Sequence, residues 1–223
     1  MQSSSITPQF FKSKYQRVEY IMRNGSNYAF IDTWRIPNRS KKLNIQMWIR
    51  YDSSWYRHCF MANWWDTSVY SNAWCVSLEV NSWSVSNNRV RVYTEPNSST
   101  GAIEFYSSNS ISTWSFHSIS LTINWTSWSL IVDSTTTNWN VASANTLNLS
   151  ELLFIDRAKR WSEFARNHYI SYFFAYENDT AVRQMYPCYR KSDNAIWMVD
   201  LVNKVFYPNA WSWSFTKWNN VPR

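Results

Sequence analysis

The chain has 223 residues, 45% of them hydrophobic and 17% charged, and its formal net charge is +7. This apolar content excludes a disordered chain, and the length fits one β-sandwich domain. No apolar run approaches the roughly 20 residues that cross a bilayer as a helix. The lysines and arginines are scattered and accompany no nucleic-acid-binding motif, so we expect neither a nucleic-acid partner nor a membrane span.

Leu43–Tyr51 is the clearest predicted strand. Its apolar residues alternate with Asn44, Gln46, Trp48 and Arg50, which is the period-two pattern of a strand with one buried face. The same alternation recurs in residues 116–124, where His117, Ile119, Leu121 and Ile123 share one face. We therefore expect the following residues to be buried between two sheets: Leu43, Ile45, Met47, Ile49, Ile119, Leu121 and Ile123.

The other predicted strands are short and are separated by turn residues. In chain order they are Val18–Met22, Tyr28–Thr33, Tyr56–Ala62, Ala73–Val80, Arg89–Tyr93, Ile103–Tyr106, Phe116–Asn124, Ser129–Asp133, Leu152–Ile155, Tyr169–Glu177, Val182–Cys188, Ile196–Asp200 and Val205–Tyr207. Two of the hairpins turn at Asn124–Ser127 and at Asn178–Asp179. Short strands at regular spacing, with almost no helical periodicity, predict an all-β fold: an antiparallel two-sheet β-sandwich or jelly roll.

The cysteines do not form a fully paired disulfide framework. The chain has 3 of them, Cys59, Cys75 and Cys188, and an odd number favours free thiols. We expect Cys188 to be unpaired. Cys59 and Cys75 would lie nearly opposite each other only if the hairpin between them turned near Asp66 and Thr67.

Tryptophan and glycine occur in unusual numbers. The chain has 16 Trp and 2 Gly, whereas about 16 glycines would be expected at the usual frequency of ~7%. Trp64, Trp125 and Trp139 each follow an asparagine, and Trp213 follows a serine. Glycine is usual in such turn contexts because it reaches positive φ without steric cost.

We interpret most of these tryptophans as UGA codons that the organism reads as glycine. Under this interpretation Trp125, Trp139, Trp211 and Trp213 lie at turns, are largely exposed or poorly packed, and in part have positive φ. The alternative is a genuine tryptophan-rich surface, which would place coplanar indoles on one sheet face for stacking on sugars. Tryptophans of the core would instead be buried, each with a partner for its indole N–H.

Both ends of the chain resemble LamG-like domains of the concanavalin A-like lectin/glucanase superfamily. Near the start the resemblance rests on Tyr15–Ile21, Asn24–Gly25, Phe30–Trp34 and Pro37–Asn38. Near the end it rests on Tyr186–Asp193, Ile196–Val202, Phe206–Asn209 and Trp211–Phe215. Trp34, Trp197, Trp211 and Trp213 stand where that pattern usually has glycine. We interpret residues 1–14 as a polar leader, and the resemblance implies a single LamG-like β-sandwich domain over 15–223. Such domains occur in phage structural proteins and bacterial surface proteins.

Candidate ligand-binding residues are few, and no shared catalytic set comes with the resemblance. The aromatic candidates for stacking on a sugar are Tyr51, Tyr56, Tyr70 and Tyr106. Calcium is the one candidate cofactor, and its candidate ligands are the loop carboxylates Asp66, Asp133, Asp156 and Asp179. The glutamates, among them Glu79 and Glu104, are dispersed and lack the one-strand carboxylate pair of sandwich glycosidases.

The sequence therefore favours a non-enzymatic recognition or structural module over an enzyme. We expect a glycan-binding or surface-binding part of a phage particle or cell-surface assembly, with virion or surface proteins as further partners. Two alternatives remain open: a sandwich glycosidase with an unrecognised carboxylate pair, and a purely structural virion subunit without a ligand. The first residues lack the apolar segment of a Sec signal peptide, so export would follow another route, such as lysis.

Overall fold

The fold is known from a computed structural model, which describes residues 15–23, 31–33, 40–52, 58–62, 75–82, 85–95, 103–141, 154–155, 168–208, 215–217 and 219–220. Every element in these ranges is a β-strand, and every strand pairing is antiparallel. Nowhere in the described ranges is there a helix long and apolar enough to span a membrane. The predicted all-β fold class is confirmed.

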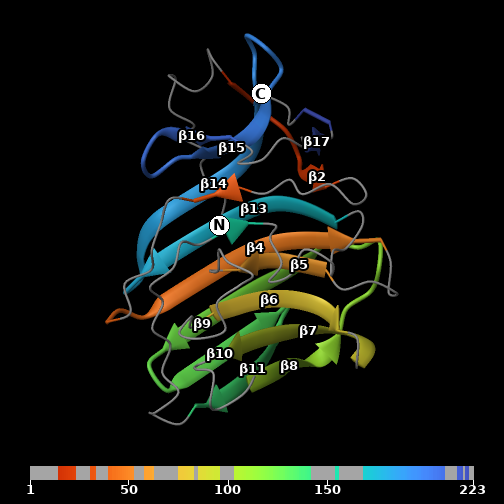
Figure 1. Cartoon of the computed structure of the whole chain (residues 1–223), viewed down its shortest axis with the longest axis vertical. Coiled ribbons are helices and arrows are strands. Elements are labelled where there is room, and N and C mark those ends of the chain that lie inside the picture. Colours follow the sequence, from red (N-terminus) through yellow and green to blue (C-terminus); the bar gives the residue numbers. More distant parts are fainter. Residues whose placement is uncertain are drawn as a thin grey trace.

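The strands form two sheets (Figure 1). The larger, 11-stranded sheet has the order β11 (Thr135–Asn140), β10 (Ser127–Val132), β9 (His117–Asn124), β4 (Leu43–Tyr51), β13 (His168–Glu177), β14 (Thr180–Arg190), β15 (Ile196–Asp200) and β16 (Val205–Tyr207), with β1 (Tyr15–Arg17), β2 (Ile21–Arg23) and β17 (Thr216–Lys217) beside it. The smaller, 6-stranded sheet has the order β3 (Ile31–Asp32), β12 (Phe154–Ile155), β5 (His58–Ala62), β6 (Cys75–Ser82), β7 (Val85–Glu95) and β8 (Ile103–Ser110).

The core lies between the facing sides of the two sheets. In the larger sheet β4 pairs with β9, so that Ile45 lies opposite Leu121 and Met47 opposite Ile119. All seven residues that we expected to be buried between the sheets are buried, which confirms that prediction. In the smaller sheet the core side is formed by Leu78, Val80, Val90 and Val92, none of which is exposed to solvent.

An aromatic contact joins the two sheets. The ring of Phe105 in β8 lies 5.6 Å from the ring of Trp128 in β10 and 5.0 Å from that of Trp139 in β11. Trp128 is almost completely buried, and its indole N–H donates to the carbonyl of Trp125 at 3.0 Å. A buried indole with a satisfied N–H is the arrangement expected of a true core tryptophan.

Two predicted hairpin turns are confirmed by the register. Glu177 pairs with Thr180, and both intervening residues, Asn178 and Asp179, have positive φ, as in a type I′ turn. In the β9–β10 hairpin Asn124 pairs with Ser127, so the two loop residues are Trp125 and Thr126.

Two tryptophans occupy backbone positions that suit glycine. The described non-glycine residues with positive φ are Asn88, Trp114, Trp125, Asp133, Asn178, Asp179, Asn194 and Lys204. Trp125 has φ of 52° at the first loop position of its hairpin, where a type II′ turn takes glycine. Trp114 has φ of 66° in the turn at residues 113–114, and both side chains are largely exposed. Bulky side chains are rare outliers at positive φ.

The other described tryptophans do not share this pattern. Trp139 lies in strand β11, is half-buried and packs on Phe105, so the prediction that it would be exposed at a turn is wrong. Its neighbours in β11 are polar, which gave no sign that this short strand reaches the core. Trp48 and Trp197 lie in ordinary strands. Trp211 and Trp213 lie outside the described residues.

The register of β5 and β6 separates Cys59 from Cys75. Cys59 pairs with Glu79, and Cys75 lies four positions before Glu79 in the same strand, which is about 13 Å along a strand. The predicted opposition of these two cysteines is therefore wrong: a bulge after Cys59 and a longer connection shift the centre of the hairpin beyond Thr67. Cys188 and Cys59 are both buried free thiols, as predicted for Cys188.

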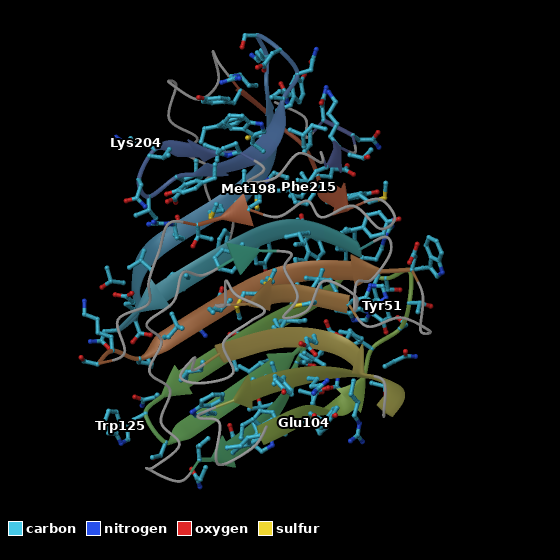
Figure 2. The ribbon with its side chains drawn as sticks, in the orientation of Figure 1. Tyr51, Glu104, Trp125, Met198, Lys204 and Phe215 are labelled. Carbon is cyan, nitrogen blue, oxygen red and sulfur yellow. The ribbon has the colours of Figure 1, made fainter. Side chains whose placement is uncertain are left out.

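Replacing Trp125 with glycine should stabilise the protein. Figure 2 shows its side chain pointing away from the sandwich at the tip of the β9–β10 hairpin, so the substitution removes little packing. Glycine has no Cβ and so removes the steric strain of a side chain at positive φ. The free energy of unfolding, measured by urea denaturation, should rise by about 1 kcal/mol. The matched control is Trp128→Ala, which should lower it by about 3–5 kcal/mol because that ring is buried. A loss of stability in Trp125→Gly would contradict the assignment of position 125 as a glycine site.

Candidate functional site

The four tyrosines proposed from the sequence as sugar-stacking residues do not form one site. Tyr51 is fully buried beneath the core face of β4, where its hydroxyl donates to the carbonyl of Ile111 at 2.9 Å, so no ring face is open to a ligand. Tyr106 is half-buried on β8 of the other sheet and donates to Glu104 Oε2 at 2.6 Å. Tyr56 and Tyr70 lie outside the described residues.

The candidate calcium ligands are also not brought together. Asp133 lies in the β10–β11 turn, where it accepts hydrogen bonds from His117 Nδ1 and the amide of Ser118. Asp179 lies in the β13–β14 turn and pairs with Lys42 at 2.6 Å. Asp66 and Asp156 lie outside the described residues. In the ranges that the structure describes, no three His, Cys, Asp or Glu side chains gather as metal ligands. Calcium stays a prediction.

A continuous series of aromatic rings crosses part of the outer face of the larger sheet, the face opposite the core. Strand alternation places Trp48 of β4 there, and its cross-strand partner Tyr172 of β13 shares that face. Ring contacts run from Phe116 to Trp48 (5.2 Å between centroids), then to Tyr172 (6.4 Å), to Phe174 (4.5 Å) and to Tyr186 (5.2 Å). We call these five residues the aromatic row.

Arg50 lies at one end of the aromatic row. It follows Trp48 on the same face of β4, and its guanidinium carbon lies 5.4 Å from the centre of the Phe116 ring. The same guanidinium lies 4.0 Å from the ring of Tyr169 and 5.4 Å from that of Tyr20. A cation over ring faces is attracted by the negative potential of the aromatic quadrupole. Arg50 is therefore held by aromatic rings.

Arg17 lies at the other end of the aromatic row. Its guanidinium carbon lies 4.0 Å from the centre of the Tyr186 ring. Burial raises the pKa of Tyr186, and Arg17 partly opposes this rise. Burial also raises the pKa of Tyr172, and the neighbouring phenol of Tyr186 adds to the effect. Both phenols therefore remain neutral hydrogen-bond donors well above neutral pH.

Uncharged polar side chains continue the same face on the β9 side of β4. The Asn44 amide nitrogen donates to Ser120 Oγ at 2.9 Å and to Thr122 Oγ1 at 2.8 Å, and Gln46 donates to Asn44 Oδ1 at 2.8 Å. Gln46 and Trp48 are adjacent on this face of β4, so amides and hydroxyls border the aromatic row. We call Asn44, Gln46, Ser120 and Thr122 the polar patch.

A serine, a histidine and an aspartate also meet, but not in the arrangement of a hydrolase triad. His117 Nδ1 lies 2.9 Å from Asp133, and its Nε2 lies 3.3 Å from Ser112 Oγ. However, Nε2 lies closer, at 3.0 Å, to the carbonyl oxygen of Ser112. A general base needs a free lone pair directed at the serine hydroxyl, whereas here both ring nitrogens face acceptors. We interpret His117 as a structural residue of β9 whose hydrogen bonds connect Ser112 with Asp133 in the β10–β11 turn.

Two carboxylates that are distant in the sequence meet on the smaller sheet. Arg91 Nη1 lies 3.3 Å from Glu79 Oε2, and Arg91 Nη2 lies 2.5 Å from Glu104 Oε1. A glycosidase would use one carboxyl of such a pair as a protonated acid, and a protonated carboxyl has no charge to give to an ion pair. With one guanidinium between them, Glu79 and Glu104 have the geometry of a structural charge network.

The outer face of the larger sheet is thus the best candidate for a binding surface. It combines apolar ring faces, cations and uncharged hydrogen-bonding groups, the mixture that is typical of ligand sites. Sequence reasoning missed it, although Tyr172, Phe174 and Tyr176 recur at period two in one strand. That recurrence on a non-core face was the available signal. No signal in the sequence showed that Phe116 and Arg17, which lie in distant segments, contact this row.

Comparisons with known proteins support the fold. No protein-family model matches the chain, and no curated protein sequence matches it. A candidate carbohydrate-binding protein from Bacteroides ovatus ATCC 8483 is similar in structure, with a TM-score of 0.57 and 9% identity over 92% of this chain and 62% of that chain. Domains LG4-5 of the mouse laminin α1 chain are similar with a TM-score of 0.50 and 11% identity over 90% of this chain and 50% of that chain.

These likenesses show the β-sandwich fold alone. The chain covers less than two thirds of the length of either structure, and identities of 9% and 11% carry no information about binding residues. The fold agrees with the LamG-like, concanavalin A-like architecture that the ends of the sequence resemble.

The buried phenol of Tyr51 should make stability fall at alkaline pH. Burial raises the pKa of Tyr51 from 10 to about 12. The folded state then holds the phenol proton more tightly than the unfolded state, so stability is complete below pH 10 and is lost between pH 10 and 12. From that window we expect a loss of about 3 kcal/mol.

The measurement is urea denaturation at pH 8 to 12 of the wild type and of Tyr51→Phe. The variant loses the hydrogen bond to Ile111, at a cost of about 1 kcal/mol at pH 8, but lacks this part of the pH dependence. Other tyrosines titrate equally in both proteins and cancel in the difference. Identical pH profiles would show that Tyr51 is not buried as described.

Proposed function

We propose that this chain is a non-enzymatic recognition module that binds glycans on the outer face of its larger sheet. The observation that carries the proposal is the aromatic row bordered by the polar patch. Sugar rings have apolar C–H faces that pack on aromatic rings, and hydroxyls at their edges that bond to amides and hydroxyls. The row of Phe116, Trp48, Tyr172, Phe174 and Tyr186 supplies the first kind of contact.

The structural comparison supports this choice of ligand class. The Bacteroides ovatus structure, described as a candidate carbohydrate-binding protein, is a neighbour of this fold at a TM-score of 0.57. A protein-binding or purely structural role would require an apolar patch that a second chain covers. Here the row of rings ends at an arginine on each side and is bordered by neutral amides, which suits a hydroxyl-rich ligand better.

We also propose that the module belongs to a phage particle or a cell-surface assembly. Support comes from the LamG-like pattern at both ends of the sequence, because such domains occur in those assemblies. The test is the coding DNA with its neighbouring genes, together with electron microscopy using an antibody against this chain. Flanking virion genes and labelled particles are expected. Labelling of neither particles nor the cell envelope would contradict this context.

Glycan binding is tested with a glycan array, followed by titration calorimetry of the best ligand. Tyr172→Ala and Phe174→Ala should each weaken binding about tenfold, because each removes a stacking face contributing on the order of 1–2 kcal/mol. Tyr106→Ala on the smaller sheet is the matched control and should bind normally.

The outcomes separate the alternatives. If Tyr106→Ala and not Tyr172→Ala weakened binding, the site would lie on the smaller sheet, beside Glu79 and Glu104. Release of reducing sugar from the bound glycan would favour the glycosidase alternative. The absence of any glycan ligand would contradict the proposal and leave the structural subunit.

We further propose that Trp114 and Trp125 are glycines in the native protein, encoded by UGA. Their positive φ values of 66° and 52° support this, as does their exposure. We expect UGA at codons 114 and 125 and UGG at codon 128, with glycine at the first two positions in peptide mass spectra of the native protein. The same spectra should cover residues 210–217. Tryptophan at positions 114 and 125 in the native peptides would contradict recoding.

A further inference from the structure

We propose that the glycan is acidic, a chain of sugars carrying carboxylate or sulfate groups, and that Arg50 and Arg17 bind those groups. This inference rests on the proposed function, because it assigns a chemical class to the ligand of the same face. Both arginines lie at the ends of the aromatic row, one over Phe116 and one over Tyr186. A sugar chain stacked along the row would reach a guanidinium at each end.

Arg50 differs from most cations of this structure in its partners. Within the described residues no carboxylate pairs with it, and its Nε atom is buried without a hydrogen-bond partner. Its surroundings are the rings of Tyr169 and Phe116, at 4.0 Å and 5.4 Å. The side chain as a whole is only half-buried, so a ligand can reach part of it. Protein interiors rarely leave such a group uncompensated, and an arriving acid group would supply the missing charge.

Three other arginines of the described residues have carboxylate partners. Arg91 pairs with Glu79 and Glu104, Arg183 lies 3.7 Å from Asp200, and Arg190 pairs with Asp193. Arg17 resembles Arg50 instead: its described contact is the Tyr186 ring, at 4.0 Å. The two arginines at the ends of the aromatic row thus have ring contacts and no carboxylate partner among the described residues, and this coincidence is the observation on which the inference depends.

The guanidinium group suits an acid ligand in particular. Its planar fork of N–H donors binds a carboxylate or sulfate through two parallel hydrogen bonds. Aromatic rings on either side exclude water and hold the fork, which strengthens the charged contact. A neutral sugar would offer hydroxyls to the same fork and would leave its charge unmatched.

Single-stranded nucleic acid is the competing ligand, because it also stacks on aromatic rings. Such ligands carry one charge per nucleotide and are held by grooves with many cations. On this face the groups beside the row are the neutral Asn44, Gln46, Ser120 and Thr122. Two arginines separated by a row of rings fit a ligand with widely spaced acid groups better.

The test is calorimetric titration of the full chain with matched pairs of hexasaccharides. The pairs are oligogalacturonate with its methyl ester, sulfated with desulfated carrageenan, and alginate with mannan. Within a pair the members are similar in length, and they differ in acid groups. We expect the acidic member of at least one pair to bind ten times or more tighter than its neutral partner, with an affinity that falls as salt rises. Preference for uronate over sulfate identifies the kind of acid group.

Two arginine variants locate the effect. Arg50→Gln and Arg17→Gln should each reduce the preference for the acidic member at least fivefold, and Arg50→Lys should reduce it partly by keeping the charge without the planar fork. Arg190→Gln is the matched control, because Arg190 is also stacked on rings but is already paired with Asp193. It should bind as the wild type does. If Arg50→Gln unfolds, the Arg17→Gln and Arg50→Lys proteins still decide the result.

Several outcomes would overturn the inference. Equal binding of both members of every pair, with loss in Tyr172→Ala, would refute the acidic ligand and leave the proposed glycan-binding function intact. Binding of no member of any pair, together with no ligand on the glycan array, would refute both the acidic ligand and the glycan-binding function. Tighter binding of a dT oligonucleotide with the same dependence on Arg50 would replace the glycan with single-stranded nucleic acid.

Discussion

The pairing of β4 with β9 on one side and β13 on the other determines the two faces of the molecule. Side chains alternate strictly along a strand, so one register assigns every residue near the centre of the larger sheet either to the core or to the outer face. Ile45, opposite Leu121, lies in the core, whereas Trp48, opposite Tyr172, lies outside. A slip of one residue would bury Arg50 and expose Met47, and for that reason the register is strongly specified.

Sequence patterns predicted the parts of the fold in which this alternation is pure. The strand Leu43–Tyr51 and the turns at Trp125 and at Asn178 follow from period two and from turn chemistry. Strand β11 was missed because every residue of Thr135–Asn140 except Trp139 is polar, and one apolar residue makes no alternation. The β5–β6 register was wrong because a bulge follows Cys59 and no tight turn fixes the pairing. Register is weakly specified by sequence wherever a long connection replaces a two-residue turn.

The candidate site was less predictable than the fold. Tyr51 and Tyr172 are the same residue type, and strand parity alone separates them: Tyr51 falls in phase with Ile49 and is buried, while Tyr172 lies opposite Trp48 and is half-exposed. This alternation could be read from the sequence, and it argued against Tyr51 as a ligand-binding residue. The contacts of Phe116 with Trp48 and of Arg17 with Tyr186 were not available, because each joins segments far apart in the chain.

The buried thiol of Cys188 has a consequence for the conditions that the protein tolerates. Burial raises its pKa, and the thiolate is the form that reacts with oxidants and disulfides. Cys188 lies in a small apolar cluster with Val199, and Cys59 is likewise a buried free thiol. Neither of these cysteines contributes a cross-link that reduction could break, and the thiol of Cys188 is poorly reactive toward oxidation. We therefore expect the apolar cluster around Cys188 to pack in the same way in reducing and oxidising surroundings.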